Sequence, residues 1–186
     1  MILSKRLSEI FNDNFKRFYK EAKNDNYLYY VLKGGRGSAK STHIAFTLIL
    51  EIIKKPITIL CVRKVGNTLS ESVYEQLKEA IDMLDLGHLF ECKKSPLQIV
   101  YKPRGNKIIF RGADDPSKIK SIKISKYPLT TLWIEELAEF KTEEEVVQFS
   151  QLGEELRTTR KPTIKDRMKA SELLGKRYRL IKLNLK

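Results

Sequence analysis

A glycine-rich stretch, KGGRGSAKST at residues 33–42, constrains the fold more than any other feature of this sequence. The segment before it, YLYYVLKGG (27–35), is apolar and aromatic until its glycines, which is typical of a buried strand. The segment after it, STHIAFTLILEIIKK (41–55), is long enough for a helix and is limited by Pro56. A glycine turn between a strand and a helix lets successive backbone N–H groups point into one concavity.

The stretch has the spacing of a phosphate-binding loop, Gly-x-x-x-x-Gly-Lys-Ser/Thr, with Ala39 in place of the second glycine. In such a loop Lys40 would reach the β- and γ-phosphates, and the Ser41 hydroxyl would ligate Mg²⁺. Ala39 is tolerated if its φ is negative, as at a helix start, and we expect that here. The alternative is a glycine turn that only caps a helix. The residues expected to bind nucleotide are Gly34, Gly35, Gly37, Ser38, Ala39, Lys40, Ser41 and Thr42.

The hydrophobic pattern of the remaining chain alternates between strand and helix. Short apolar runs predict buried strands, and apolar residues spaced three and four apart predict helices. This order indicates an α/β fold of the P-loop NTPase type, with a mostly parallel sheet between helices and an inserted β-hairpin near 97–112. The predicted elements are a helix at 4–22, a strand at 57–63, a helix at 68–87, the hairpin and a strand at 128–136.

Two carboxylates follow the last of these strands. In nucleotide hydrolases with such a loop, an apolar strand ends in an acid that holds Mg²⁺ through water, and a second acid often polarises the attacking water. Glu135 is therefore the candidate for Mg²⁺, although aspartate is usual there, and Glu136 is the candidate general base. The alternative is two exposed glutamates at a helix start, where the helix dipole favours them.

Arg36 places a fixed cation inside the loop. A guanidinium there would lie close to the charge that develops on a γ-phosphate, so Arg36 is a candidate arginine finger acting in cis. The alternative is a surface arginine paired with a nearby acid. The sequence does not separate these two interpretations.

The net charge of +13 is unevenly distributed. Residues 1–134 carry 24 Lys and Arg against 13 Asp and Glu, residues 135–155 carry eight Glu and one Lys, and residues 156–186 carry 11 Lys and Arg against two acids. Such an excess of Lys and Arg indicates a polyanionic partner, such as nucleic acid. The alternative is a lysine-rich surface that is only solvated. No segment is long and apolar enough to cross a membrane.

Four segments in this order resemble the N-terminal ATPase domain of the phage terminase large subunit, over roughly residues 27–145. They are YVLKGGRGSAKST, ILCVRKVGNTLSESVYEQLKEAI, IIFRGADDPSKIKSIK and LWIEELAEF. The resemblance implies Mg²⁺-dependent ATP hydrolysis coupled to DNA translocation. It assigns Gly34 to Thr42 to the phosphate loop, Arg36 to the cis-acting arginine, and Glu135 and Glu136 to the metal and catalytic positions. It also implies as partners double-stranded DNA, a portal, a small terminase subunit and further copies of the chain, in the host cell cytoplasm.

The chain also departs from that family. Its 186 residues leave no room for the C-terminal nuclease domain, and the coupling motif Ser-aromatic-Asn-Pro is not found. In the family that motif lies on the strand after the Glu pair, and this strand lies in the sheet between the loop strand and the Glu-pair strand. Only RYRLIKLNL (177–185) is a candidate for it, and a half-polar run suits an edge strand better. We therefore expect a truncated chain, with an incomplete ATPase domain at 1–155, a basic tail at 156–186 and weak activity.

Two other function classes are compatible with the sequence. The chain could be a nucleotide- or DNA-binding module that has lost catalysis, which its charge and the missing strand would suit. A small-molecule kinase is less favoured, because we find no arginine-rich lid and no acceptor site after the loop.

Overall fold

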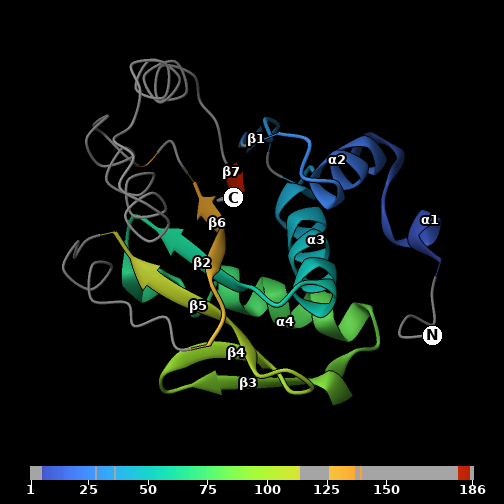
Figure 1. The fold of residues 1–186 in the computed structure, drawn as a ribbon. Helices are drawn as coiled ribbons and strands as arrows, with labels where there is room; N and C mark the ends of the chain where they lie inside the picture. Colours follow the sequence, from blue (N-terminus) through green and yellow to red (C-terminus); the bar gives the residue numbers. More distant parts are fainter. Residues whose placement is uncertain are drawn as a thin grey trace, which may run out of the picture.

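The computed structural model describes residues 6–27, 29–35, 37–113, 126–136, 139 and 180–184. Within them, one seven-stranded sheet has the order β1-β7-β6-β2-β5-β4-β3 (Figure 1). The strands are β1 (Tyr29–Val31), β2 (Thr58–Arg63), β3 (Phe90–Lys94), β4 (Leu97–Tyr101), β5 (Asn106–Gly112), β6 (Leu129–Glu135) and β7 (Leu180–Asn184). The α-helices are α1 (Leu7–Ile10), α2 (Asp13–Lys23), α3 (Lys40–Lys54) and α4 (Val73–Met83), and short 3-10 turns lie at Gly66–Thr68 and Gly87–Leu89.

The sheet is mixed, and most of its described strands point the same way. β2 pairs in parallel with β5 on one side and with β6 on the other. β7 and β4 run antiparallel to both of their neighbours, so β1, β6, β2, β5 and β3 share one direction. The prediction of an α/β fold with a mostly parallel sheet is confirmed. The carboxyl ends of β1, β2 and β6 lie at one edge of the sheet, where ligands bind in open α/β folds.

The predicted helix after the glycine loop and the predicted hairpin both form, as α3 and as β4–β5. The predicted N-terminal helix is instead two helices, because Asn12 takes an extended backbone with ψ of 150° and starts α2 anew. The sequence pattern did not predict β3, which pairs antiparallel with β4 at the edge of the sheet. Of its five residues only Phe90 is buried, so the strand carries no alternating pattern that a sequence could reveal.

β7 corrects our expectation for the last apolar run. We expected 177–185 to suit an edge strand, but β7 lies between β1 and β6, with Leu183 opposite both Tyr29 and Leu132. It pairs antiparallel with both neighbours, so its backbone hydrogen bonds are used on both sides, as in an interior strand. The position between the loop strand and the Glu-pair strand is therefore occupied. The division of the chain into a domain at 1–155 and a tail stays a prediction.

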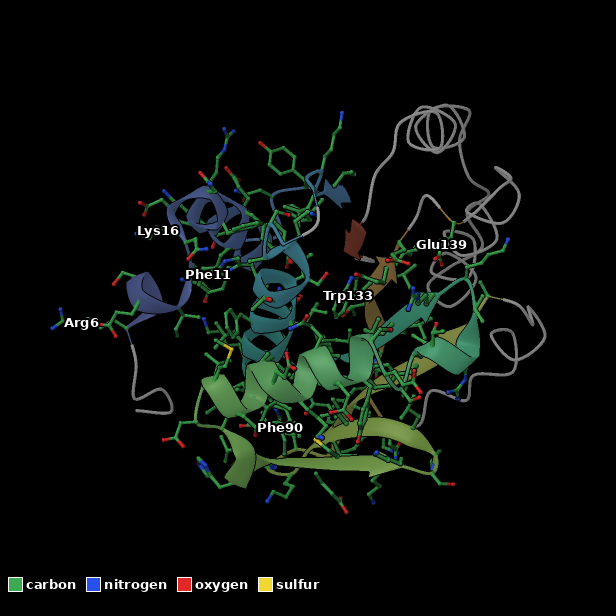
Figure 2. The ribbon with its side chains drawn as sticks, turned by 180° about the vertical axis from the view of Figure 1, so that it is seen from behind. Arg6, Phe11, Lys16, Phe90, Trp133 and Glu139 are labelled. Carbon is green, nitrogen blue, oxygen red and sulfur yellow. The ribbon has the colours of Figure 1, made fainter. Side chains whose placement is uncertain are left out.

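The core lies between the sheet and the helices. Seen from behind in Figure 2, α3 is upright and α4 runs across it on one face of the sheet, the face that carries the fully buried Trp133 of β6. Aromatic stacking attaches the N-terminal segment to α3: the ring centroids of Phe15 in α2 and His43 are 4.2 Å apart, and those of Phe11, just before α2, and His43 are 5.5 Å apart. The N-terminal helices thus brace the first turns of α3, which begins at the glycine loop.

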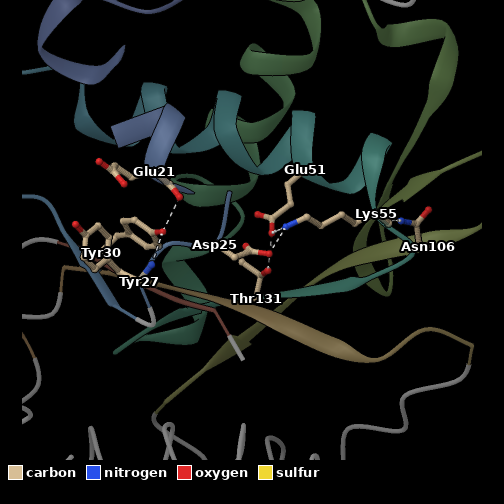
Figure 3. A network of polar contacts seen from close by, with 8 residues as sticks. All are labelled: Glu21, Asp25, Tyr27, Tyr30, Glu51, Lys55, Asn106 and Thr131. Atoms are coloured by element: carbon tan, nitrogen blue, oxygen red, sulfur yellow. Dashed lines mark hydrogen bonds and ion pairs between the residues drawn. The ribbon is translucent and has the colours of Figure 1, made fainter. Parts of the chain in front are cut away.

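A polar network fixes the other end of α3 to the sheet (Figure 3). Lys55 forms ion pairs with Asp25 at 2.8 Å and with Glu51 at 3.5 Å. Glu51 accepts a hydrogen bond of 3.3 Å from the buried Thr131 hydroxyl on β6, and Asn106 donates to the carbonyl oxygens of Ile52 and Lys55. Because both ends of α3 are held, the helix is a rigid support for the loop that precedes it.

Candidate nucleotide-binding site

The glycine loop joins β1 to α3 and lies at the carboxyl edge of the sheet. Gly37 has φ of +73°, a left-handed conformation in which glycine is favoured. Ser38 donates a hydrogen bond of 2.8 Å to the carbonyl oxygen of Gly35, which closes the loop. Thr42, in the first turn of α3, accepts a long contact of 3.5 Å from Gln76 of α4. Arg36 lies outside the described residues, so its assignment as an arginine finger stays a prediction.

The structure contradicts our expectation for Ala39. Its φ is +56° and its ψ is +20°, which is left-handed rather than helical. A side chain with a Cβ costs about 1–2 kcal/mol in this conformation. The loop pattern has glycine at this position for the same reason. Ala39 is therefore a strained residue immediately before the helix, and the loop keeps its shape despite it.

Lys40 is buried, with 6% of its surface exposed. Its Nζ donates to the carbonyl oxygens of Gly34 at 2.9 Å and Gly35 at 2.8 Å, and it also contacts the Ser38 hydroxyl. A Cβ on Gly34 would lie 3.3 Å from this Nζ and 3.1 Å from the Ser38 Oγ. Glycine at position 34 therefore lets the loop wrap this closely around the ammonium group. A cation cradled beside a helix N-terminus fits an anionic phosphate.

Glu135, the last residue of β6, faces the loop helix. Its Oε1 accepts a hydrogen bond of 2.9 Å from the Ser41 hydroxyl, and its Oε2 accepts one of 3.0 Å from the Trp133 indole. Burial raises the pKa of Glu135 to about 7; these two hydrogen bonds favour the ionised form and oppose that rise. The Ser41 and Glu135 oxygens together are the ligand types that Mg²⁺ prefers.

Glu136 is oriented differently. It follows the end of β6 with φ of +52°, and its carboxylate forms an ion pair of 2.5 Å with Arg63, the last residue of β2. Arg63 also lies 3.6 Å from Glu139. The structure thus brings Lys40, Ser41 and Glu135 together, with Glu136 beside Glu135 and paired with Arg63.

Sequence reasoning missed two residues of this site, Arg63 and Trp133. For Arg63 a signal existed: it ends a buried strand, and parallel strands end at the same edge of a sheet. For Trp133 a local signal also existed, because residues two apart on a strand share one face, which places its indole beside Glu135. No group of three or more His, Cys, Asp or Glu residues able to hold a metal occurs in the part of the chain that the structure describes.

The chain is similar in sequence to proteins of one known family. A sequence model of the family described as phage terminase large subunit matches residues 25–171, most of the chain. The chain belongs to the phage terminase large subunit family. It is 62% identical over 141 residues to the terminase large subunit of Bacillus phage SPP1, and 36% identical over 115 residues to the PBSX phage terminase large subunit of Bacillus subtilis strain 168.

These matches cover 76% and 62% of this chain, but only 33% and 25% of the two relatives. The chain therefore spans about a third or less of the length of these large terminase subunits. The solved large terminase of a thermophilic bacteriophage superposes with a TM-score of 0.51 at 18% identity, over 64% of this chain and 29% of that one. That likeness supports the fold. Among the described helices, none is long and apolar enough to span a membrane.

Proposed function

We propose that this chain is the ATP-binding and ATP-hydrolysing motor part of a terminase that packages viral DNA. The hydrogen bond between Ser41 and Glu135 carries this proposal, because it joins the loop helix to the end of β6 at the edge where a nucleotide would bind. Two residues far apart in the sequence thereby offer adjacent oxygens beside a buried lysine. Membership of the terminase family supports the same function.

Each site residue has a role in this proposal. The loop amides and Lys40 bind the β- and γ-phosphates, and Lys40 exchanges loop carbonyls for phosphate oxygens. Ser41 and Glu135 hold Mg²⁺, which when bound supplies positive charge against the phosphate oxygens. Glu136 accepts the proton of the attacking water, and Arg36 offers a further cation from within the loop.

The proposed partners follow from the family and from the net charge of +13. They are double-stranded DNA, a portal, a small terminase subunit and further copies of the chain, in the host cell cytoplasm. If the basic surface contacts duplex phosphates, affinity for labelled duplex DNA falls steeply with salt between about 50 and 200 mM, by on the order of 10³ for about six contacts, with little sequence preference. Affinity insensitive to salt argues against this use of the surface.

Glu136→Gln tests the catalytic assignment. The amide keeps the shape of the side chain and removes the base, so ATP still binds while single-turnover hydrolysis falls by about a hundredfold to ten-thousandfold. Glu91→Gln is the matched control, because Glu91 is exposed on β3, away from the loop. Equal hydrolysis in Glu136→Gln and wild type would refute the role of Glu136.

A nucleotide- or DNA-binding chain with weak hydrolysis is the second candidate. The pairing of Glu136 with Arg63 favours it, because a carboxylate held by a guanidinium is less available to a water molecule. Measuring ATP turnover with and without duplex DNA separates the two. We expect turnover below about 1 s⁻¹ from the truncated chain in either case, so the effect of DNA decides: turnover that DNA does not change fits the second candidate.

A further inference from the structure

The ammonium group of Lys40 is enclosed by oxygen atoms of its own loop. Its Nζ donates hydrogen bonds to the carbonyl oxygens of Gly34 at 2.9 Å and Gly35 at 2.8 Å, and it contacts the hydroxyl of Ser38. Three acceptors match the three N–H donors of an ammonium group. We call this arrangement of the four residues the closed loop. In it, the cation that would bind phosphate is already engaged by the protein.

The Ser38 hydroxyl joins the lysine to the loop backbone. It donates its hydrogen to the carbonyl oxygen of Gly35 at 2.8 Å, and its own oxygen accepts from Lys40. A hydroxyl has one donor and two acceptor lone pairs, so it sustains both contacts at once. The same Gly35 oxygen also accepts from Lys40, so the three groups form a ring of hydrogen bonds.

The loop backbone is shaped around this ring. Gly37 and Ala39, on either side of Ser38, are both left-handed, with φ of +73° and +56°. The serine between them is half-buried, and its hydroxyl is turned back to the loop. A Cβ on Gly34 would lie 3.1 Å from the Ser38 Oγ, so glycine at position 34 leaves room for the hydroxyl. Conformations of this cost persist where the surrounding structure holds them, and the ring is such a restraint.

We propose that Ser38 is a positioning residue: its hydroxyl holds the Lys40 ammonium group in the closed loop and thereby competes with ATP. This inference rests on the proposed function, in which Lys40 binds the β- and γ-phosphates. A phosphate oxygen gains an N–H of Lys40 only in exchange for a loop acceptor. When only a fraction of the molecules have the binding-competent conformation, the apparent affinity is reduced by that fraction. Ser38 therefore lowers the affinity for ATP.

The opposite role, in which the Ser38 hydroxyl is a phosphate ligand, predicts the opposite sign. A hydroxyl that donates to phosphate strengthens binding, so its removal weakens binding. A hydroxyl that restrains Lys40 opposes binding, so its removal strengthens it. The geometry favours the restraint, because a phosphate oxygen needs a donor and the single hydroxyl hydrogen of Ser38 is given to Gly35.

The test compares Ser38→Ala with Ser38→Thr, which keeps the hydroxyl, and with Thr68→Ala. Thr68 is a matched control, because its hydroxyl also donates to the carbonyl oxygen three residues earlier, that of Val65, at 2.9 Å. Stopped-flow fluorescence with a fluorescent ATP analogue gives the rate constants and Kd for the 186-residue chain. For Ser38→Ala we expect a lower Kd and faster association, each by about three- to tenfold, the scale of one net hydrogen bond. Dissociation and both control variants should match wild type.

A second measurement does not depend on ATP. Brief labelling with acetic anhydride, followed by peptide mass spectrometry, reports how often the Lys40 amine leaves the loop oxygens, because a buried and hydrogen-bonded amine is protected. Lys33, exposed at the start of the same loop, is the internal reference. In Ser38→Ala we expect the labelling of Lys40 relative to Lys33 to rise by about three- to tenfold, with no change in Ser38→Thr.

Three results overturn the inference: an unchanged or higher Kd in Ser38→Ala, unchanged labelling of Lys40 in that variant, or a lower Kd that Ser38→Thr shares. If Ser38→Ala does not fold, Ser38→Cys takes its place, with a smaller fall in Kd, because a thiol is a weak donor and acceptor. If the wild-type chain binds no ATP, the proposed function fails separately, and the labelling alone decides whether Ser38 holds Lys40.

Discussion

The Ser41 hydroxyl donates a hydrogen bond of 2.9 Å to Oε1 of Glu135, although the two residues are 94 positions apart in the sequence. One lies in the first turn of the helix after the glycine loop, and the other ends β6. Their contact makes the loop and the strand end one site.

Removing the Ser41 hydroxyl should weaken metal use. In Ser41→Ala, Glu135 loses the hydrogen bond that favours its ionised form, and the metal loses a ligand. We expect the Mg²⁺ concentration needed for half-maximal ATP-analogue binding to rise by about tenfold, the lower end of the cost of losing a supporting contact. Ser41→Thr keeps the hydroxyl and should resemble wild type. A Ser41→Ala variant with an unchanged Mg²⁺ titration contradicts the assignment.

Lys40→Ala should lower ATP affinity by on the order of a hundredfold, because charge-assisted hydrogen bonds to phosphate are lost. Isothermal titration calorimetry measures this directly. Lys33→Ala is the control, since Lys33 is an exposed lysine at the start of the same loop. Wild-type affinity in Lys40→Ala would defeat the phosphate-loop interpretation.

Ala39→Gly should stabilise the chain. Glycine relieves the left-handed strain at φ of +56°, worth about 1–2 kcal/mol, but adds entropy to the unfolded state, so we expect a net gain of about 0.5–1 kcal/mol in the free energy of unfolding. Urea denaturation measures it. Ala45→Gly, inside α3, should show the opposite sign, with a loss of about 1 kcal/mol. A loss in both variants would show that Ala39 is not strained.

The partly buried Glu135 should make stability depend on pH. Its pKa rises from 4.5 to about 7 on folding, so between these values the folded chain keeps a proton that the unfolded chain loses. The free energy of unfolding therefore falls as pH rises through this window, by about 3 kcal/mol in total, and the loss is complete above about pH 7. Urea denaturation in EDTA at four values from about pH 5 to about pH 8 measures it. Glu135→Gln should lack this decline, and parallel curves for the two proteins contradict the prediction.

β7 should stabilise the sheet from its interior. Leu183→Pro removes a backbone N–H from a strand with neighbours on both sides, and we expect a loss of about 3 kcal/mol or more. The β1 amides that hydrogen-bond to β7 should exchange faster, because β7 is the neighbour of β1 in the described sheet. Leu183→Val keeps the N–H and should stay close to wild type. If Leu183→Pro changes neither the free energy of unfolding nor the amide exchange, the position of β7 inside the sheet is contradicted.

The sequence by itself determined the local elements of this protein. The glycine loop, the apolar run before it and the apolar helix after it predict β1, the loop and α3, because hydrophobic period and backbone freedom are properties of neighbouring residues. The local pattern also predicts β6, because its apolar run ends in Glu135 and Glu136. The candidate nucleotide site could therefore be predicted as a set of residues.

Only the tertiary structure decided how those residues are held. The left-handed backbone of Ala39 and Glu136 and the pairing of Arg63 with Glu136 depend on how the loop and the strand ends are packed. The place of β7 depends on pairing as well, because a short half-polar run forms an edge or an interior strand according to which hydrogen-bonding partners remain open. Local pattern specifies each element, and long-range hydrogen bonds and burial specify its neighbours.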